Sequence, residues 1–526
     1  MLYYWSIVIC GAAFVLCRAF LSPSSYQLWI SISDAVTDCL SVVFDFILTR
    51  QNGILHRRTG KQIPSCPWKW PNGQGDVAKF LDGMENSELW GSDYGGCYRI
   101  WAGTSPEIVV SKPQHIKTAF HDSDKHLKAH NNDSGYLMSQ VLGKCLGLVS
   151  GHEYATLRGL LEPYFTYSQS SCYLQRIQQR TDEWLLKKNI VNNGQKERLQ
   201  LDPVNDFKFL PFLIVADILY GNISPEMEAQ LLSMAPGRER LFQHVIGGGL
   251  SRFSVSKYLP TQANRTLHAF QQQWTKFNAD AYERAIKEGY SEAIVVQLFE
   301  AAKRGSISWD HCNQTLDEML FANLDVTMGA LAWNLVHLAD NLDVQSAVRD
   351  EIAKRTTLNG DVQVGSGLSG LSGEMKEYLQ SSATLLAACM LESSRLRPLA
   401  AFTVPQAAPT DRVIDDYTIP ARTSFVVDAF ALNIRNDYWG EDRFSYRPQR
   451  FLDMSRSDTR YRYWRFGFGP RQCLGKYVAE LILRTVTVRL LSRFILHVPA
   501  SESKLWQRDR ETWISQPKIK LELECL

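Results

Sequence analysis

The chain has 526 residues, of which 45% are hydrophobic and 21% charged, a composition typical of a globular protein with material for one large core or several domains. The formal net charge is +2 and no long basic run occurs, so the charge pattern gives no support for nucleic-acid binding. The 11 cysteines include no C-x-x-C pair, which favours reduced thiols on a cytosolic face over a disulfide framework or a zinc site.

The first segment, Leu2 to Leu21, is apolar over the length that crosses a hydrocarbon core of about 30 Å, and only Arg18 interrupts it. Arginines follow downstream at Arg50, Arg57 and Arg58, which predicts that the rest of the chain lies on the cytoplasmic side. We therefore expect a single-pass membrane anchor here. The alternative is a cleaved signal peptide, which the lack of a basic stretch before the apolar run disfavours.

The anchor, residues 1–22, is followed by a connecting region that we place at residues 23–75. Within it, Tyr26 to Leu48 carries three aspartates, so we expect an amphipathic or interfacial helix rather than a second span. The run IPSCPWKWPNG, Ile63 to Gly73, contains three prolines and two tryptophans, and it predicts a linker whose tryptophans sit at the membrane interface.

The main domain, residues 76–526, shows helical periodicity with a minor β component, which predicts a mainly α fold with a small β region. The glycine cluster Gly247 to Gly249 lacks a following G-K-[ST] and predicts a turn between helices rather than a phosphate loop. In chain order we expect strands at Tyr98–Gly103 and Glu107–Lys112, mostly helices over 117–340, a surface loop at Asn359–Glu374, a helix over Met375–Leu396, strands at Phe402–Val404 and Ser424–Val427, and a final helix over Lys476–Phe494.

One cysteine differs from the others because the stretch FGFGPRQCLG surrounds it. Gly467 and Gly469 permit tight or left-handed turns, and Pro470 then fixes the direction of the chain. The final helix begins directly afterwards, so Cys473 lies near a helix N-terminus, where free N–H groups and the helix dipole stabilise an anionic sulfur. Because a thiolate is the form that binds metals, Cys473 is the candidate metal ligand.

Two further motifs precede this loop in a fixed order. Glu392-Ser-Ser-Arg395 places a carboxylate and a guanidinium on one helical face, and YRPQRF supplies Arg450. Such a pair alone is weak evidence, because exposed helices carry many of them. Together, the ExxR motif, the PxRF-type segment and FGFGPRQCLG resemble the cytochrome P450 superfamily over most of the chain.

The resemblance implies a cytochrome P450 fold in which the Cys473 thiolate is the axial iron ligand of haem b. It also implies that Arg471 meets a haem propionate, that Phe466 packs against the sulfur, and that Gly475, the last residue of the loop motif, belongs to the cofactor-binding residues. By the same resemblance Glu392, Arg395 and Arg450 form a buried charge network whose role is structural rather than catalytic.

A further helix segment, GHEYATLR, places Tyr154 and Arg158 four residues apart. Relatives usually carry tryptophan and arginine at this spacing, both in contact with the propionates, so the resemblance implies that Tyr154 and Arg158 bind haem. A surface helix could show the same pair. Gln406 stands where many relatives have an arginine for the other propionate, which weakens the expected clamp at that position.

The distal helix is expected over Phe321 to Asn341, a segment that resembles the helix crossing the far face of the haem. The family pattern ends in an acid and a threonine, but here Asp325 is followed by Val326, and the family glycine has become Asn323. Valine cannot hold a proton-donating water. Asn323 and Thr327 share a helix face, so we expect these two residues and Asp325 to carry proton delivery. The alternative is that Thr327 only bonds to its own helix.

The function implied by the resemblance is a monooxygenase in the endoplasmic reticulum membrane. It would take electrons from an NADPH-cytochrome P450 reductase and use O₂ to oxidise a small hydrophobic substrate. Basic residues near the cysteine loop could face that reductase, or could form a solvated surface; they are Arg460, Arg462, Arg465 and Lys476.

Two other functions stay open. Val326 favours a non-catalytic haem-thiolate protein that binds a ligand or senses gas, and an isomerase or dehydratase would use the haem without external electrons. For the substrate, DVTMGALAWNLVHLADN and TVPQAAPTDRVIDDYTIP are similar to filamentous-fungal members of secondary-metabolite pathways that make gliotoxin-like diketopiperazine mycotoxins. That similarity implies hydroxylation or oxidative ring formation on an amino-acid-derived scaffold.

Overall fold

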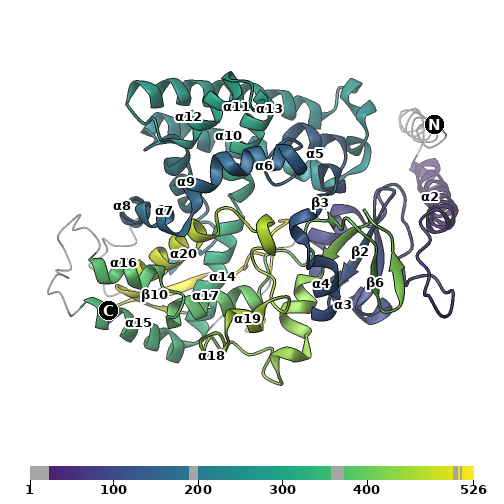
Figure 1. Cartoon of the computed structure of the whole chain (residues 1–526). Helices are drawn as coiled ribbons and strands as arrows, with labels where there is room; N and C mark the ends of the chain where they lie inside the picture. Colours follow the sequence, from purple (N-terminus) through teal and green to yellow (C-terminus); the bar gives the residue numbers. More distant parts are fainter. Residues whose placement is uncertain (1–22, 189–198, 357–371, 501–507, 510–511) are drawn as a thin grey trace.

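The structure is a computed structural model that describes residues 23–188, 199–356, 372–500, 508–509 and 512–526. The expected anchor at Leu2–Leu21 and most of the expected loop at Asn359–Glu374 lie outside these residues. Helices make up most of the described chain (Figure 1). They are α2 (Pro23–Gln51), α3 (Gly83–Tyr94), α4 (Pro113–Phe120), α5 (Tyr136–Val141), α6 (Gly151–Leu161), α7 (Tyr167–Cys172), α8 (Leu174–Lys187), α9 (Leu210–Tyr220), α10 (Pro225–Gly247), α11 (Gln262–Lys287), α12 (Ile294–Lys303), α13 (Trp309–Leu320), α14 (Val326–Asp340), α15 (Leu342–Thr356), α16 (Gly373–Gln380), α17 (Leu385–Leu396), α18 (Arg450–Asp453), α19 (Arg456–Thr459) and α20 (Lys476–Leu491).

The strands form small sheets beside the helices. A five-stranded sheet has the order β1-β2-β8-β5-β3, in which only β2 and β8 run parallel, and β4, β10 and β9 form a second sheet. A two-stranded sheet joins β6 to β7. The strand bounds are β1 (Cys97–Ala102), β2 (Ser105–Val110), β3 (Leu127–Lys128), β4 (Leu199–Leu201), β5 (Gln406–Ala407), β6 (Arg412–Ile414), β7 (Tyr417–Ile419), β8 (Ser424–Val427), β9 (Phe494–His497) and β10 (Leu521–Cys525).

Several expected elements are confirmed, and one strand is displaced. β1, β2 and β8 occur where the sequence predicts strands, and the glycine cluster ends α10 in a turn. The strand expected at Phe402–Val404 is wrong, because Phe402 forms only an isolated bridge to Asp428 and the strand β5 begins at Gln406. Pro405 lies between them and has no N–H to donate to a sheet ladder.

The helix expected over Met375–Leu396 is two helices, α16 and α17. The break falls where Thr384 caps α17 by accepting a hydrogen bond from the N–H of Ala387 at 3.1 Å. The Glu351 carboxylate accepts two further N–H groups at the start of the same helix. Because these side chains satisfy the free donors of a helix start, a new helix begins there. The final helix, α20, ends at Leu491, since the chain turns and enters β9 at Phe494.

The linker tryptophans differ from the prediction. Trp68 is 1% exposed, donates its indole N–H to the carbonyl of Gly103 at 2.7 Å, and packs against Trp101 and Phe44 of α2. The expectation that these residues sit at a membrane interface is therefore wrong for Trp68, because its ring belongs to the core. α2 itself is the expected helix, and it leaves apolar side chains exposed, with Val42 at 71% and Phe46 at 64%.

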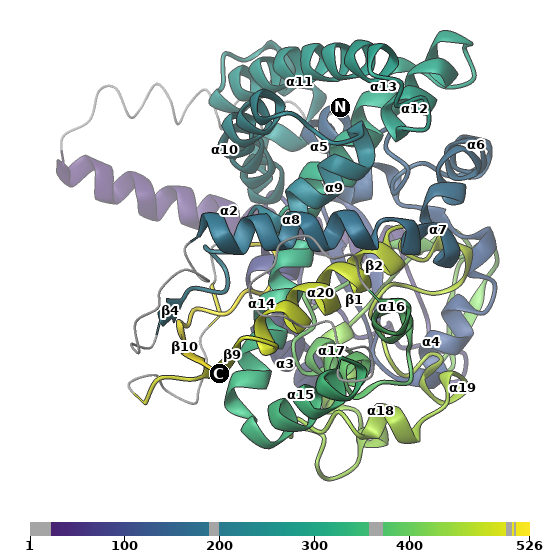
Figure 2. The ribbon, with the colours of Figure 1, turned by 90° about the vertical axis from the view of Figure 1, so that its left-hand side faces the viewer.

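The core surrounds α14, which runs through the centre of the molecule, with α8 and α20 lying side by side next to it (Figures 1 and 2). Within the described residues, Trp309–Asp340 is the one helical stretch long and apolar enough to cross a membrane, but most of it is buried, as in the core helix of a soluble domain.

The single distal helix expected over Phe321–Asn341 is interrupted. α13 ends at Leu320, a 3-10 turn covers Phe321–Asn323, and α14 starts at Val326. The side-chain Nδ2 of Asn323 donates to the carbonyls of Met319 at 3.0 Å and Glu318 at 3.4 Å. A side chain that takes up helix carbonyls in this way competes with the backbone ladder, which explains the break.

Candidate cofactor site

The cysteine loop has the shape that its glycines predict. Gly467 and Gly469 have φ angles of 83° and 63°, in the left-handed region that favours glycine. A Cβ on Gly469 would stand 2.4 Å from the Oγ of Ser123, so the close packing of this segment also requires glycine. The N–H of Cys473 donates to the carbonyl of Phe466 at 2.9 Å and closes the loop. Gly475 then forms the N-cap of α20.

The Cys473 side chain is accessible to solvent although protein atoms crowd it, as expected for a ligand that faces a space inside the protein. Burial raises the pKa of this thiol, and the backbone N–H of Gly475 partly offsets the increase. The backbone N–H at the helix start therefore favours the thiolate, while burial opposes it. A bound metal cation removes the thiol proton directly.

The residues predicted to meet the propionates gather against this loop. The Arg471 guanidinium lies 3.9 Å from the centre of the Tyr154 ring and donates to the carbonyl of Val149 at 2.7 Å. Tyr154 donates its hydroxyl to the carbonyl of Pro470 at 2.8 Å. Arg158 donates to the carbonyl of Gln472 at 3.2 Å and to the Glu162 carboxylate at 2.9 Å, so α6 is tied to the part of the loop that precedes the cysteine.

One cationic residue of this site was missed by sequence reasoning. Lys128 of β3 pairs across the sheet with Gln406 of β5, the position where the family resemblance implies an arginine in many relatives. Burial and the charge of Arg471 lower the pKa of Lys128 to about 7. No carboxylate among the described residues forms an ion pair with it. Because the lysine stands opposite Gln406, it can supply the positive charge that the glutamine lacks.

These residues fit the haem that the resemblance implies. The accessible thiol of Cys473 offers one axial ligand, and three cations, Lys128, Arg158 and Arg471, gather beside the loop. Their nearby carboxylates are Glu162, which pairs with Arg158, and Glu318, whose charge acts on Lys128 and Arg471, so the cations are in excess. A group with two carboxylates, such as the propionates of haem b, would balance this charge.

We predict that Lys128→Met weakens haem retention. The variant loses one hydrogen bond to a charged group, which is worth about 1.5 kcal/mol. This corresponds to roughly tenfold weaker haem binding, observed as faster haem loss. The measurement is the haem-to-protein absorbance ratio after transfer to apomyoglobin. Lys125→Met, which removes an exposed lysine from the same segment, is the control and should retain haem like the wild type. Equal retention in both variants would exclude Lys128 from the site.

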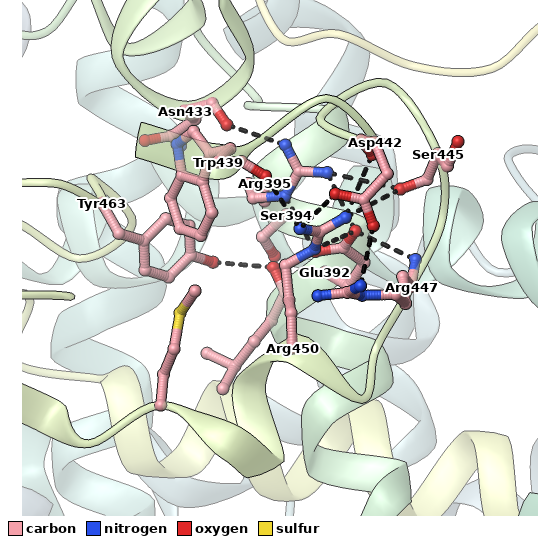
Figure 3. Close-up of polar contacts among 12 residues, drawn as sticks. Glu392, Ser394, Arg395, Asn433, Trp439, Asp442, Ser445, Arg447, Arg450 and Tyr463 are labelled. Carbon is pink, nitrogen blue, oxygen red and sulfur yellow. Dashed lines mark hydrogen bonds and ion pairs between the residues drawn. The ribbon is translucent and has the colours of Figure 1, made fainter. Parts of the chain in front are cut away.

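The ExxR motif forms the buried network shown in Figure 3. Glu392 accepts two hydrogen bonds from Arg395 at 2.8 Å and one from Arg450 at 3.0 Å, and all three side chains are at most 1% exposed. Arg450 also donates to Asp442, and the backbone N–H of Arg447 donates to Glu392. The guanidinium charges are thus balanced by carboxylates and carbonyls, and the network holds α17 against the segment that leads to the cysteine loop.

The distal residues lie at the break between α13 and α14. Asp325 borders a cavity of about 740 Å³ that α10, the distal helix and the C-terminal segment enclose. Burial, followed by the charge of Glu239, raises the pKa of Asp325, while Lys208, Gln516 and Trp513 oppose the increase. Thr327 is buried, and its hydroxyl forms no hydrogen bond with another described residue, so the bond to its own helix is not observed.

Comparisons with known proteins agree with this site. A family model described as Cytochrome P450 matches residues 84–524. The chain is 47% identical to Cytochrome P450 monooxygenase aclC of Aspergillus oryzae over 464 residues, which are 88% of this chain and 91% of that protein. It is 42% identical over 526 residues to Cytochrome P450 monooxygenase asaD of Aspergillus flavus (100% and 97%), and 38% identical over 492 residues to Cytochrome P450 monooxygenase gliC of Aspergillus fumigatus (92% and 93%). The match to asaD covers the whole chain, so it includes the cysteine loop and both arginine motifs.

Proposed function

Since the chain belongs to the cytochrome P450 family and is a monooxygenase, we propose that it oxidises a hydrophobic, amino-acid-derived metabolite of the diketopiperazine class, by hydroxylation or oxidative ring formation. The observation that supports the haem-thiolate chemistry is the accessible Cys473 thiol on a shaped loop beside three cations. The substrate class is supported by the similarity of two sequence segments to fungal members of diketopiperazine pathways. When bound there, haem b supplies the one-electron chemistry that activates O₂.

The chain's own residues divide the remaining tasks. Cys473 holds the cofactor, while Lys128, Arg158 and Arg471 orient it through its carboxylates. The cavity beside Asp325 receives the substrate and places aromatic side chains of Phe242, Phe321 and Trp513 around it. Apolar rings exclude water from the reacting face, which protects the chemistry from side reactions.

We propose that electrons come from NADPH through a membrane-bound reductase that docks on the basic residues near the cysteine loop. Arg465 is engaged internally, because it pairs with Glu480 at 2.7 Å and its side chain is 10% exposed. Arg460 is exposed, and Arg462 and Lys476 are partly exposed, so these three remain as docking charges.

The proposed location is the endoplasmic reticulum membrane, with residues 1–22 as a single anchor and the haem domain in the cytosol. The exposed apolar side chains of α2, among them Val42, Val43 and Phe46, support this placement, since they lie on the helix that follows the anchor.

The test is reconstitution with a P450 reductase, NADPH and cyclic dipeptides, with product, NADPH and hydrogen peroxide measured on one preparation. A monooxygenase of this class consumes NADPH and forms an oxygenated or oxidatively cyclised product. An isomerase or dehydratase forms product without NADPH, and a ligand-binding haem protein forms none. Either of these results would contradict the proposal.

Within this assay we expect Asn323→Leu combined with Thr327→Val to cut product per NADPH by about 10²-fold and to raise peroxide, as expected for loss of a positioned proton donor. Asn323 already donates to helix carbonyls, so the free Thr327 hydroxyl is the stronger candidate to hold a water. Val326→Thr should be tolerated. Unchanged coupling in the double variant would mean that protons arrive through the substrate or through Asp325.

A further inference from the structure

The C-terminal segment that borders the distal cavity is fixed against α14. Trp333 of α14 donates its indole N–H to the carbonyl of Ser515 at 2.9 Å, and the N–H of Ser515 donates to the carbonyl of Leu399 at 2.7 Å. Ile514 lies 3.2 Å from the place a Cβ on Gly329 would occupy. The next residue, Gln516, is therefore held in a defined position relative to the distal helix.

Gln516 is 3% exposed, and its Nε2 makes no hydrogen bond of ordinary geometry with a described residue. Burial raises the pKa of the Asp325 carboxyl, and the side chains of Gln516 and Trp513 oppose this rise, as expected for donors that face the carboxylate. A buried amide donor without a well-formed partner is costly in an empty site, and a ligand that accepts its hydrogen bond recovers this cost.

Asp325 and Gln516 both line the 740 Å³ cavity, so an acceptor and a donor face the same space. Trp513, Phe242 and Phe321 line the same cavity and offer apolar faces beside this polar pair. The wall therefore combines a polar edge with aromatic surroundings, which is the usual composition of a site that orients one small molecule.

The charged residues around Asp325 determine which kind of ligand group binds favourably to its carboxyl group. Lys208 and Glu239 pair at 2.7 Å on the cavity wall, and Glu239 adds negative potential at Asp325. Arg238, also on this wall, pairs with Asp317 at 2.9 Å and so gives its charge to another carboxylate. An N–H donor suits such a carboxylate, because it pairs the acceptor without adding a like charge.

We propose that Asp325 and Gln516 together recognise a lactam, a ring amide whose N–H and C=O point to the same side. Asp325 accepts the N–H and Gln516 donates to the C=O. An open-chain secondary amide is trans and directs the two groups to opposite sides, so it cannot satisfy both residues at once. This inference rests on the proposed function and specifies it, because a diketopiperazine contains two such ring amides.

The experiment measures binding rather than turnover, by titration calorimetry on the haem-loaded full chain with cyclo(L-Phe-L-Phe) and its N,N′-dimethyl derivative. The wild type should bind the unmethylated ring about 10- to 100-fold more tightly, the range for hydrogen bonds to a charged group. In Asp325→Leu this preference should collapse, because leucine offers no acceptor to the N–H of the unmethylated ring. Gln516→Leu should weaken both rings, since both keep their carbonyls.

The matched control is Gln243→Leu, which removes an amide from another part of the same cavity wall and should leave the preference unchanged. If Asp325→Leu does not fold, Asp325→Ala removes the same acceptor with less added bulk. A preference that persists in the Asp325 variants would overturn the inference, because the methyl groups would then act only by their size. If that preference persists and the wild type still oxidises cyclic dipeptides, the proposed function holds and only the inference about Asp325 and Gln516 fails. If the wild type neither binds nor oxidises cyclic dipeptides, both the proposed function and the inference fail.

Discussion

Replacing Cys473 with alanine is expected to abolish stable haem binding while leaving the protein folded. The structure gives this residue no packing role, because its side chain is accessible and the loop is closed by its backbone N–H to Phe466. The glycine conformations at Gly467 and Gly469 do not depend on the thiol either. Loss of the sulfur therefore removes the axial ligand without removing the scaffold, and the cationic residues cannot replace a metal ligand.

The measurement is haem content together with the carbonyl spectrum after reduction with dithionite. The wild type should show the strongly red-shifted Soret band of a thiolate complex, and Cys473→Ala should retain almost no haem. Cys172→Ala, which removes another exposed cysteine, should behave like the wild type. A normal, histidine-like carbonyl spectrum in the wild type would contradict the assignment of the ligand.

The contrast between Cys473 and Lys128 shows which part of the site the sequence can predict. The cysteine loop, the ExxR pair and the Tyr154/Arg158 pair are local patterns, so spacing and residue type identify them without a structure. Lys128 belongs to a two-residue strand whose partner, Gln406, is far away along the chain. No periodicity marks so short a strand, and only the sheet register brings the lysine opposite the missing arginine.

The fold differs from prediction where tertiary contacts override local pattern. Apolar periodicity continues through the distal helix, but the Asn323 side chain takes helix carbonyls and breaks it. Trp68 lies in a proline-rich segment whose composition predicts an interfacial linker. In the structure it is buried by Trp101 of β1 and Phe44 of α2, which lie in two other elements. Gln516 carries no sequence signal at all, since its significance comes from its position beside Asp325.

The second large effect is expected for Glu392→Gln, which should lower the free energy of unfolding by about 3–5 kcal/mol, the usual cost of leaving buried charges uncompensated. Glu392 is fully buried and accepts hydrogen bonds from Arg395, from Arg450 and from the backbone N–H of Arg447. Glutamine has nearly the same shape, but its NH₂ group is a donor and cannot accept a hydrogen bond from a guanidinium group. Both arginines would then keep their charge with less compensation.

The measurement is the thermal transition of the haem-loaded protein, with urea unfolding where it is reversible. Asp442→Asn is the matched control, because Asp442 contacts the same Arg450 but its side chain is 38% exposed, so its loss should cost no more than about 1 kcal/mol. The Glu392 variant should keep the thiolate carbonyl spectrum in its folded fraction, because no atom of the network contacts Cys473. If Glu392→Gln were as stable as Asp442→Asn, carbonyl groups such as those of Asn433 and Trp439 would have to balance the two guanidinium charges without a buried anion.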